Sequence, residues 1–258
     1  MTERTGMTEV REIHTRLGRV SLAVDDARVY WLHARPGTAG PELAEQAFAE
    51  RWFGSRRLPR ILVLLRTFAE RFDAYPPALE LLHRWRPDDP ATRRALCHWH
   101  TQLSDPLYRR FTGELLPERR VRRAADVSRD VVARWLDRLT AGRWAPSTNL
   151  RLADGLLAAA TEAGLCAPGC GRRPLRTPRV TDEALTYLLY LLREVDREGG
   201  LLESPYLVSV GLGGTLLEQQ LRRLEALDYR RHGDLHDFGW RYENLLAWGA
   251  GGRAQEAA

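Results

Sequence analysis

Apolar residues recur at the spacing of an α-helix in one short segment after another between Leu22 and Leu139. The segment "RILVLLRTFAERF" is the most regular, and it places five apolar side chains on one face of a helix: Ile61, Leu64, Leu65, Phe68 and Phe72. Prolines then divide the chain into short helices, at Pro76, Pro77, Pro87 and Pro90. Almost nothing here alternates between apolar and polar residues as a strand would. The pattern therefore predicts a mainly α protein.

The helical pattern tightens in "STNLRLADGLLAAATEAG", where Ser147 or Thr148 is expected to cap the helix and Gly164 to end it. The segment "DVVARWLDRL" predicts another helix before it, and "AGRWAPS" breaks the chain between the two. After it, "LC" and "PLRTPRV" can form two short strands that flank the turn "APGCGRR". Helix, turn, helix and hairpin is the order of a winged helix-turn-helix, which we expect over residues 121–180.

The rest of the chain divides around this module. We expect a compact multi-helix N-terminal part over residues 20–120, a C-terminal helical part with a short β-hairpin over residues 181–248, and flexible ends over residues 1–18 and 249–258. In the C-terminal part, a helix capped by Ser204 is followed by one that opens with Thr215 and Glu218, and then by the hairpin "YRRHGDLHDFGW". This order again is helix, turn, helix and hairpin. The residues themselves show no repeat, so the similarity is one of order alone.

Basic residues are informative only where they cluster. The chain has 258 residues and a net charge of +5, which favours a polyanionic partner. All 39 of its basic residues are Arg, and the richness in Ala, Leu, Gly and Pro indicates a GC-rich genome that writes Arg for most cations. The expected wing stands out because it carries four Arg in eight residues with no acid among them: Arg172, Arg173, Arg176 and Arg179. Each can make forked contacts to phosphate.

The second helix of the expected module is the candidate for contact with bases. Its N-terminal part offers four side chains: Ser147, Thr148, Asn149 and Arg151. Gly155 and Ala158 leave its exposed face flat, which allows a close approach. Asp154 and Glu162 lie on the same face, and carboxylates there are unfavourable beside phosphates. We therefore expect binding to duplex DNA that is led by phosphate contacts, with modest sequence preference.

A second basic cluster precedes the module and consists of Arg119, Arg120, Arg122 and Arg123. It can extend the footprint along the DNA backbone. It can equally pair with Glu118, Asp126 and Asp130 inside the protein. The sequence leaves both alternatives open.

Metal and catalytic motifs are weak. Cys166 and Cys170 have the spacing of a zinc-binding pair, and Cys97 with His100 could complete a four-ligand site. A half-motif completed from a distant segment is weaker than the alternative, incidental thiols, so we expect no metal and no cofactor. The segment "GLGG" lacks the lysine of a phosphate loop, and "HGDLHDF" is best explained as a polar turn. We expect no enzyme.

The composition also indicates the compartment. Three Cys do not form a disulfide framework, and the first residues have no apolar stretch typical of a secretory signal. The longest strongly apolar run, "ALTYLLYLL", has nine residues, whereas a membrane-spanning helix needs about 20. We expect a cytoplasmic protein that does not contact a membrane.

The order of several segments resembles a known family. "W-x3-T" at Trp144 to Thr148, "LLAAATEAGL", the basic hairpin, "PRVTDEALTYLLYLL", "SPYLVSVGL" and "GDLHDFGWRYENLL" together resemble the BrxA family of the BREX bacteriophage-exclusion systems, over roughly residues 20–248. The resemblance implies a mostly helical protein that binds DNA without catalysis. It also implies possible partners: a site-specific DNA methyltransferase, a phosphatase-like protein and a large ATPase. The turn with Cys166 and Cys170 departs from the family, and no DNA-contacting residue can be carried over from it.

These observations favour a non-enzymatic DNA-binding accessory component of a phage-defence system. The alternative is a protein-interaction scaffold that holds other defence subunits through its aromatic-rich helices without touching DNA. A transcription regulator would need a dimer matched to two half-sites, and the chain has no extended coiled-coil segment to form one.

Overall fold

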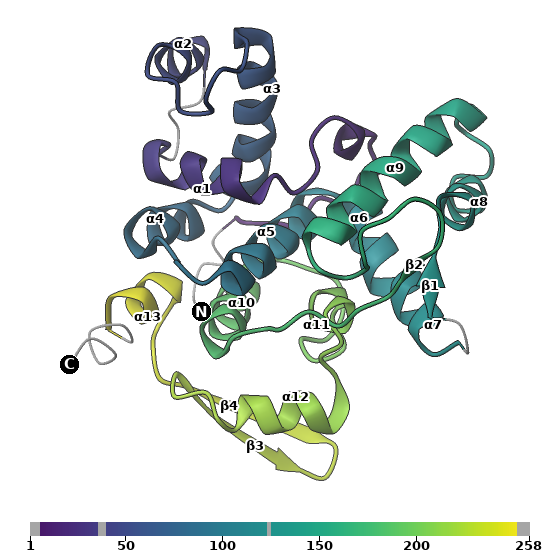
Figure 1. Cartoon of the computed structure of the whole chain (residues 1–258). Coiled ribbons are helices and arrows are strands. Elements are labelled where there is room, and N and C mark those ends of the chain that lie inside the picture. Colours follow the sequence, from purple (N-terminus) through teal and green to yellow (C-terminus); the bar gives the residue numbers. More distant parts are fainter. Residues whose placement is uncertain (1–5, 36–39, 123–124, 252–258) are drawn as a thin grey trace.

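Short helices make up most of the chain (Figure 1), so the mainly α fold class is confirmed. The computed structural model describes residues 6–35, 40–122 and 125–251. The α-helices are α1 Val24–His33, α2 Pro41–Ala49, α3 Leu58–Phe68, α4 Pro76–Trp85, α5 Pro90–Ser104, α6 Pro106–Arg110, α7 Leu116–Arg120, α8 Arg129–Leu139, α9 Pro146–Glu162, α10 Asp182–Glu194, α11 Pro205–Ser209, α12 Gly214–Leu221 and α13 Leu245–Gly251. Single turns of other helix types are η1 Arg16–Gly18, η2 Ala69–Asp73 and η3 Phe111–Leu115. The strands pair antiparallel, β1 Asp126–Val127 with β2 Arg173–Pro174 and β3 Leu227–His232 with β4 Leu235–Trp240.

Proline sets where many of these helices begin. It occupies the first or second position of α2, α3, α4, α5, α6, α9 and α11. There its missing N–H leaves no bond unmade, and its fixed φ suits the helix. Carboxylates complete two of these starts: Asp89 accepts from the N–H of Thr92 at 2.8 Å before α5, and Asp105 accepts from the N–H of Tyr108 at 2.9 Å before α6. This punctuation produces many short helices rather than a few long ones.

Helix α5 runs through the middle of the molecule (Figure 1), and every residue of it from Ala95 to Ser104 is buried. A continuous apolar cluster surrounds it and extends from Met7 to Trp248. Burial of apolar surface on this scale is the main force that holds the helices together. The N-terminal helices, the module expected over residues 121–180 and the C-terminal part therefore share one core.

Residues 6–18 pack against this core, so the expectation of a flexible end over residues 1–18 is wrong for this part of it. Met7 is buried, and the buried carboxylate of Glu9 accepts hydrogen bonds from the Tyr206 hydroxyl at 2.5 Å and the Glu198 N–H at 3.0 Å. The polar residues that suggested a frayed end instead satisfy buried groups far along the chain. Residues 1–5 lie outside the described residues. In the tail expected over residues 249–258, Gly249 to Gly251 end α13 and the others lie outside the described part.

The elements β1, α8, α9 and β2 follow one another in the order of a winged helix-turn-helix. Asp126 pairs with Pro174 and Val127 with Arg173, and a bridge between Cys166 and Leu175 adds a third short strand segment. Residues 167–172 form the loop at the end of the hairpin. The cap of α9 differs from the prediction: its N-cap is Ala145, because Pro146 takes the first helical position and moves the start ahead of Ser147 and Thr148.

Near the C-terminus, α11, α12, β3 and β4 again follow one another as two helices and a hairpin, although among the described residues no strand like β1 precedes them and pairs with the hairpin. The hairpin pairs over six positions, from Leu227 with Trp240 to His232 with Leu235. Gly233 adopts the left-handed conformation that its tight turn requires, with φ of 62°. The chain therefore carries two modules with the element order of a winged helix.

Candidate nucleic-acid interface

The hairpin of the first winged helix exposes a strip of cations. We call residues 167–179 the basic wing. The Arg172 side chain is 81% exposed, and its guanidinium reaches Asp126 at 3.6 Å. Arg176 and Arg179 are exposed, and their guanidinium groups make neither a hydrogen bond nor an ion pair with the described residues. Three of the four predicted wing cations are therefore available to an anionic partner.

Arg173 is the exception and is removed from the predicted DNA contacts. Its Nη1 donates to the Leu157 carbonyl at 3.2 Å and to the Thr161 hydroxyl at 2.8 Å. Successive side chains of a strand point to opposite faces, so Arg172 points to solvent and Arg173 points back to α9. Its guanidinium fastens the basic wing to α9 instead of facing a ligand.

The cluster before the module also serves the protein's own structure. The guanidinium of Arg119, at 13% exposure, binds the Asp126 carboxylate at 3.0 Å. Arg120 donates to the Ser209 carbonyl at 2.7 Å and to the Arg176 carbonyl at 3.2 Å, and burial lowers the pKa of its guanidinium. Of the two alternatives left open for this cluster, contacts inside the protein are the ones that the structure shows for these two residues, because Arg119 joins α7 to β1 and Arg120 joins α7 to the basic wing and to α11.

The remaining two members of that cluster differ. Arg122 is exposed and pairs with Glu118 one turn earlier. An exposed pair of this kind contributes less than about 1 kcal/mol, so it can be exchanged for a phosphate contact. Arg123 lies outside the described residues.

At the start of α9 the predicted contacts separate into two groups. Ser147 and Arg151 are exposed and Thr148 is half-buried, so they stay candidates. Asn149 is only 3% exposed and its amide donates to Asp137 at 3.4 Å, so its prediction as a DNA contact is wrong. The helical wheel held the signal for this: Asn149 precedes Leu152 by three positions, which places it on the apolar face.

The rest of the outward face of α9 is covered by the chain's own N-terminal segment. A methyl group at Gly155 would lie 3.1 Å from the Leu17 carbonyl oxygen and 3.2 Å from the Gly18 Cα. Glu162 accepts a hydrogen bond from the Ala23 N–H at 2.7 Å. The expectation that Gly155 leaves an open face for DNA is therefore wrong, since η1 makes the close approach. The outward face of α9 therefore remains exposed only as far as Asp154.

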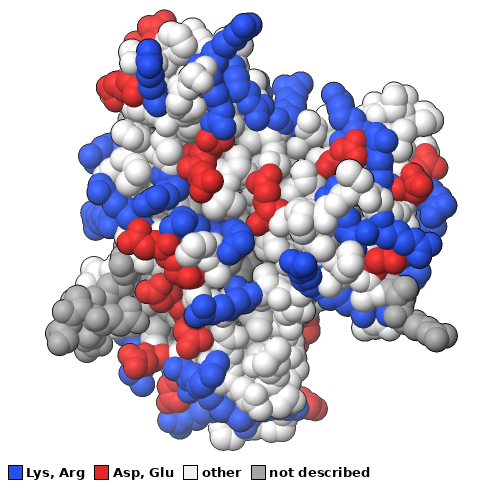
Figure 2. Space-filling model, viewed as in Figure 1, with Lys and Arg blue, Asp and Glu red and all other residues white. Residues whose placement is uncertain are grey.

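The charge distribution agrees with this smaller interface. Figure 2 shows blue side chains predominating over the region of α7, α8, β1 and β2 at the right of the view, with acidic ones between them. Asp154, which faces outward from α9, is paired with Arg129 at 2.9 Å, so its charge is partly offset. The sequence analysis missed Arg143, which is exposed in the turn before α9. Its position next to a predicted helix start was the available signal.

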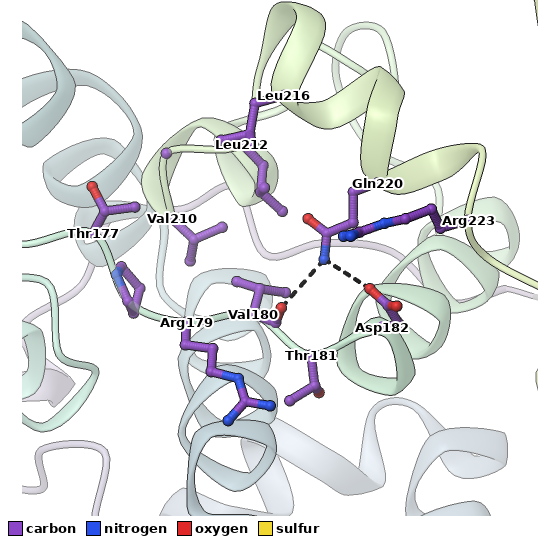
Figure 3. Close-up of a pocket in the computed structure, with 12 residues that line it drawn as sticks. Thr177, Arg179, Val180, Thr181, Asp182, Val210, Leu212, Leu216, Gln220 and Arg223 are labelled. Carbon is purple, nitrogen blue, oxygen red and sulfur yellow. Dashed lines mark hydrogen bonds between the residues drawn. The ribbon is translucent and has the colours of Figure 1, made fainter.

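A groove of about 430 Å³ lies beside the basic wing, between residues 177–182 and α12 (Figure 3). Its apolar floor includes Val210 and Leu212, and Arg179 and Arg223 lie along it on different elements. Gln220 closes one end by donating to the Val180 carbonyl and to Asp182, each at 3.2 Å. The groove brings the chain segment that leaves the basic wing next to the second winged helix. No sequence motif predicted it.

The residues considered for zinc are engaged elsewhere. Both ring nitrogens of His100 are hydrogen-bonded, Nδ1 to the Arg71 carbonyl at 2.8 Å and Nε2 to the Tyr187 hydroxyl at 2.7 Å. Cys97 and Cys166 are buried, and Cys170 is exposed. Within residues 6–35, 40–122 and 125–251, no three His, Cys, Asp or Glu side chains gather as metal ligands would.

Two further findings concern the chain as a whole. Among the described residues, no helix combines the length and the apolar character needed to cross a bilayer. No family model matches the chain, and no curated protein matches it. A crystal structure of an uncharacterized protein from Magnetospirillum magneticum is similar, with a TM-score of 0.58, 18% identity, and coverage of 71% of this chain and 97% of that chain. At this identity the likeness shows a shared fold alone.

Proposed function

We propose that this chain binds duplex DNA through the basic wing and the start of α9. The observation that carries the proposal is the row of exposed cations Arg172, Arg176 and Arg179 on the hairpin of a winged-helix arrangement. In such modules the second helix and the wing contact the duplex together. Exposed guanidinium groups suit phosphate oxygens, which they bind in a forked geometry.

Phosphate contacts lead this binding. The accessible part of α9 offers only Ser147, Thr148 and Arg151, next to the carboxylate of Asp154. Phosphates carry no base identity, so affinity that depends on them varies little with DNA sequence and falls steeply with salt. No reaction step is part of this proposal.

The biological role rests on the resemblance to the BrxA family. On that basis we propose a cytoplasmic accessory component of a BREX phage-defence system, acting beside the methyltransferase, the phosphatase-like protein and the ATPase. Binding to DNA would bring the protein to the same molecule on which the methyltransferase acts.

The alternative, a scaffold for other subunits, draws on one observation. Phe48 on α2 and Leu62 on α3 are exposed by 50% and 42%. The exposed Trp residues that would favour this alternative are missing, because all eight Trp lie in the described part of the chain and each is buried or half-buried. We therefore place DNA binding first.

The test is a titration of the purified full chain on unrelated duplexes at several salt concentrations, followed by fluorescence anisotropy. Phosphate-led binding predicts similar affinity for each duplex and a linear fall of log affinity with log salt. An absence of binding at low salt, or an affinity that salt does not change, would refute the proposal.

A further inference from the structure

The second helices of the two winged modules bury the same positions. The N-cap of α9 is Ala145 and that of α12 is Gly213. Four, seven and eight positions after its N-cap, each helix has a buried side chain: Asn149, Leu152 and Ala153 in α9, and Leu217, Gln220 and Leu221 in α12. The two helices are therefore seated on their modules in the same orientation.

Their outward faces correspond in the same way. Two, six and nine positions after the N-cap, α9 presents Ser147, Arg151 and Asp154, and α12 with its C-cap residue presents Thr215, Gln219 and Arg222. All six are exposed. At about 100° per residue, each set of three spans roughly 60° opposite the buried face. This is the face that a winged helix turns toward the major groove.

What the two faces carry differs. The α9 face ends in the carboxylate of Asp154, and beyond it η1 covers the helix at Gly155. The α12 face offers a hydroxyl, an amide and a guanidinium, and none of the three is a carboxylate. Glu218, the acid nearest to that face, is held at one side by Arg231 at 2.7 Å.

These side-chain types match the edges of base pairs. Arg binds the acceptors of guanine in a bidentate manner, Gln does the same with adenine, and Thr can contact either. The Arg222 side chain is 55% exposed, and its guanidinium lies 3.5 Å from the Glu218 carboxylate. An exposed ion pair of this kind contributes at most about 1 kcal/mol, so a contact with DNA can replace it. The face of α12 is therefore suited to base reading in a way that α9 is not.

The two hairpins also differ, and here it is the first module that offers the groups suited to DNA. In the second hairpin Arg230 pairs with Asp228 at 2.7 Å and Arg231 pairs with Glu218, so its cations are satisfied internally. The basic wing of the first module keeps Arg172, Arg176 and Arg179 exposed. One module thus has the phosphate-binding hairpin and the other has the polar helix.

We infer that α12 is the helix that enters the major groove, where Thr215, Gln219 and Arg222 read base edges while the basic wing and the start of α9 hold phosphates. The inference rests on the proposed function, since it requires that the chain binds duplex DNA. The groove of Figure 3 joins the two parts, because Arg179 at the end of the basic wing and Arg223, two residues after the end of α12, line it together.

The test begins with the full-length protein and a pool of duplexes whose central base pairs are randomised. Selection should enrich a short motif. Gln219→Ala with Arg222→Ala should then lower the preference for that motif over a scrambled duplex by about tenfold to a hundredfold, as the loss of base contacts predicts. The matched control is Arg151→Ala at the corresponding position of α9, which should weaken binding to both duplexes alike and therefore keep the preference.

Further measurements distinguish a failure of the inference from a failure of the proposed function. Gln219→Glu should change the identity of the enriched bases, because a carboxylate accepts from cytosine. All the substituted side chains are exposed, and equal thermal melts will show that each variant is folded. Loss of the preference in Arg151→Ala, or no enriched motif from a protein that binds all duplexes, would overturn the inference and leave the proposed function intact. If the wild-type protein binds no duplex at any salt, the proposed function fails, and the inference fails with it.

Discussion

Arg172 and Arg173 are neighbours in sequence, but the structure assigns them opposite roles, and this can be tested by one substitution at each. Arg173→Ala removes the hydrogen bonds to the Leu157 carbonyl and the Thr161 hydroxyl. Bonds from a charged donor contribute about 1.5–3 kcal/mol each to the free energy of unfolding. The buried Nε–H of Arg173 has no partner, which offsets part of this gain. We expect Arg173→Ala to lower the free energy of unfolding by about 1.5–3 kcal/mol.

For a chain of this size, that loss corresponds to a fall in Tm of roughly 3–12 °C. Arg172→Ala changes a side chain that is 81% exposed, so we expect at most about 1 kcal/mol. The two variants lose the same charge, which makes each the control for the other. Urea unfolding gives the stability, and salt-dependent anisotropy gives the binding.

The binding results should be the reverse of the stability results. Arg172→Ala should reduce the slope of log affinity against log salt by about 0.9, and Arg173→Ala should leave it unchanged. If Arg173→Ala unfolds like the wild-type protein and loses binding, its guanidinium faces DNA and the reasoning from strand alternation is refuted.

Three further outcomes follow from buried groups. Asn149→Leu introduces the residue type found at the corresponding position of α12, Leu217, and removes a buried amide oxygen that has no partner among the described residues. It should leave DNA binding unchanged and raise the free energy of unfolding by up to about 1 kcal/mol. Lower stability in urea unfolding would contradict the equivalence of the two helices. Gly155→Ala should lower the free energy of unfolding by about 1–3 kcal/mol, because its methyl group presses on the backbone of η1, and an unchanged Tm would show that η1 yields. Burial lowers the pKa of His98 to about 3 and that of His100 to about 4, so the histidines of the unfolded chain protonate first as the pH falls. The free energy of unfolding is therefore fully present above about pH 6.5 and should drop by roughly 2 kcal/mol per histidine by pH 5. Urea unfolding at the two pH values measures this drop, and equal stabilities would disprove it.

Local patterns in the sequence predicted the helices and their order. The apolar face of α9 and the prolines at helix starts are signals that act within a few residues, and they decide where a helix forms. The order of a winged helix followed from these signals and from the turn "APGCGRR". The exposed state of Arg172, Arg176 and Arg179 also followed, because a short hairpin beyond the apolar periodicity is solvated.

The errors came from interactions between distant segments. Nothing near Gly155 shows that η1 will cover it, because that contact joins residues far apart in the chain. The inward direction of Arg173 depends on the register of β1 with β2, which a two-residue strand does not reveal in sequence. Arg120 looked like part of a basic patch because its acceptors are backbone carbonyls of later segments, which carry no sequence signal. The pairing of Arg119 with Asp126 was one of the alternatives that the sequence left open.

The central claim is that the basic wing binds DNA phosphates, and one comparison tests it most directly. The triple variant Arg172→Ala, Arg176→Ala and Arg179→Ala is compared with a control that loses the same charge from α3, its N-cap residue and α4: Arg57→Ala, Arg66→Ala and Arg84→Ala, all of them exposed. Helices α3 and α4 lie away from β2 of the basic wing in Figure 1. We expect the wing variant to keep its Tm and to lose roughly 2–3 units from the slope of log affinity against log salt, with the control close to the wild-type protein. Equal slopes for the two variants would show that net charge alone attracts DNA and would contradict the claim.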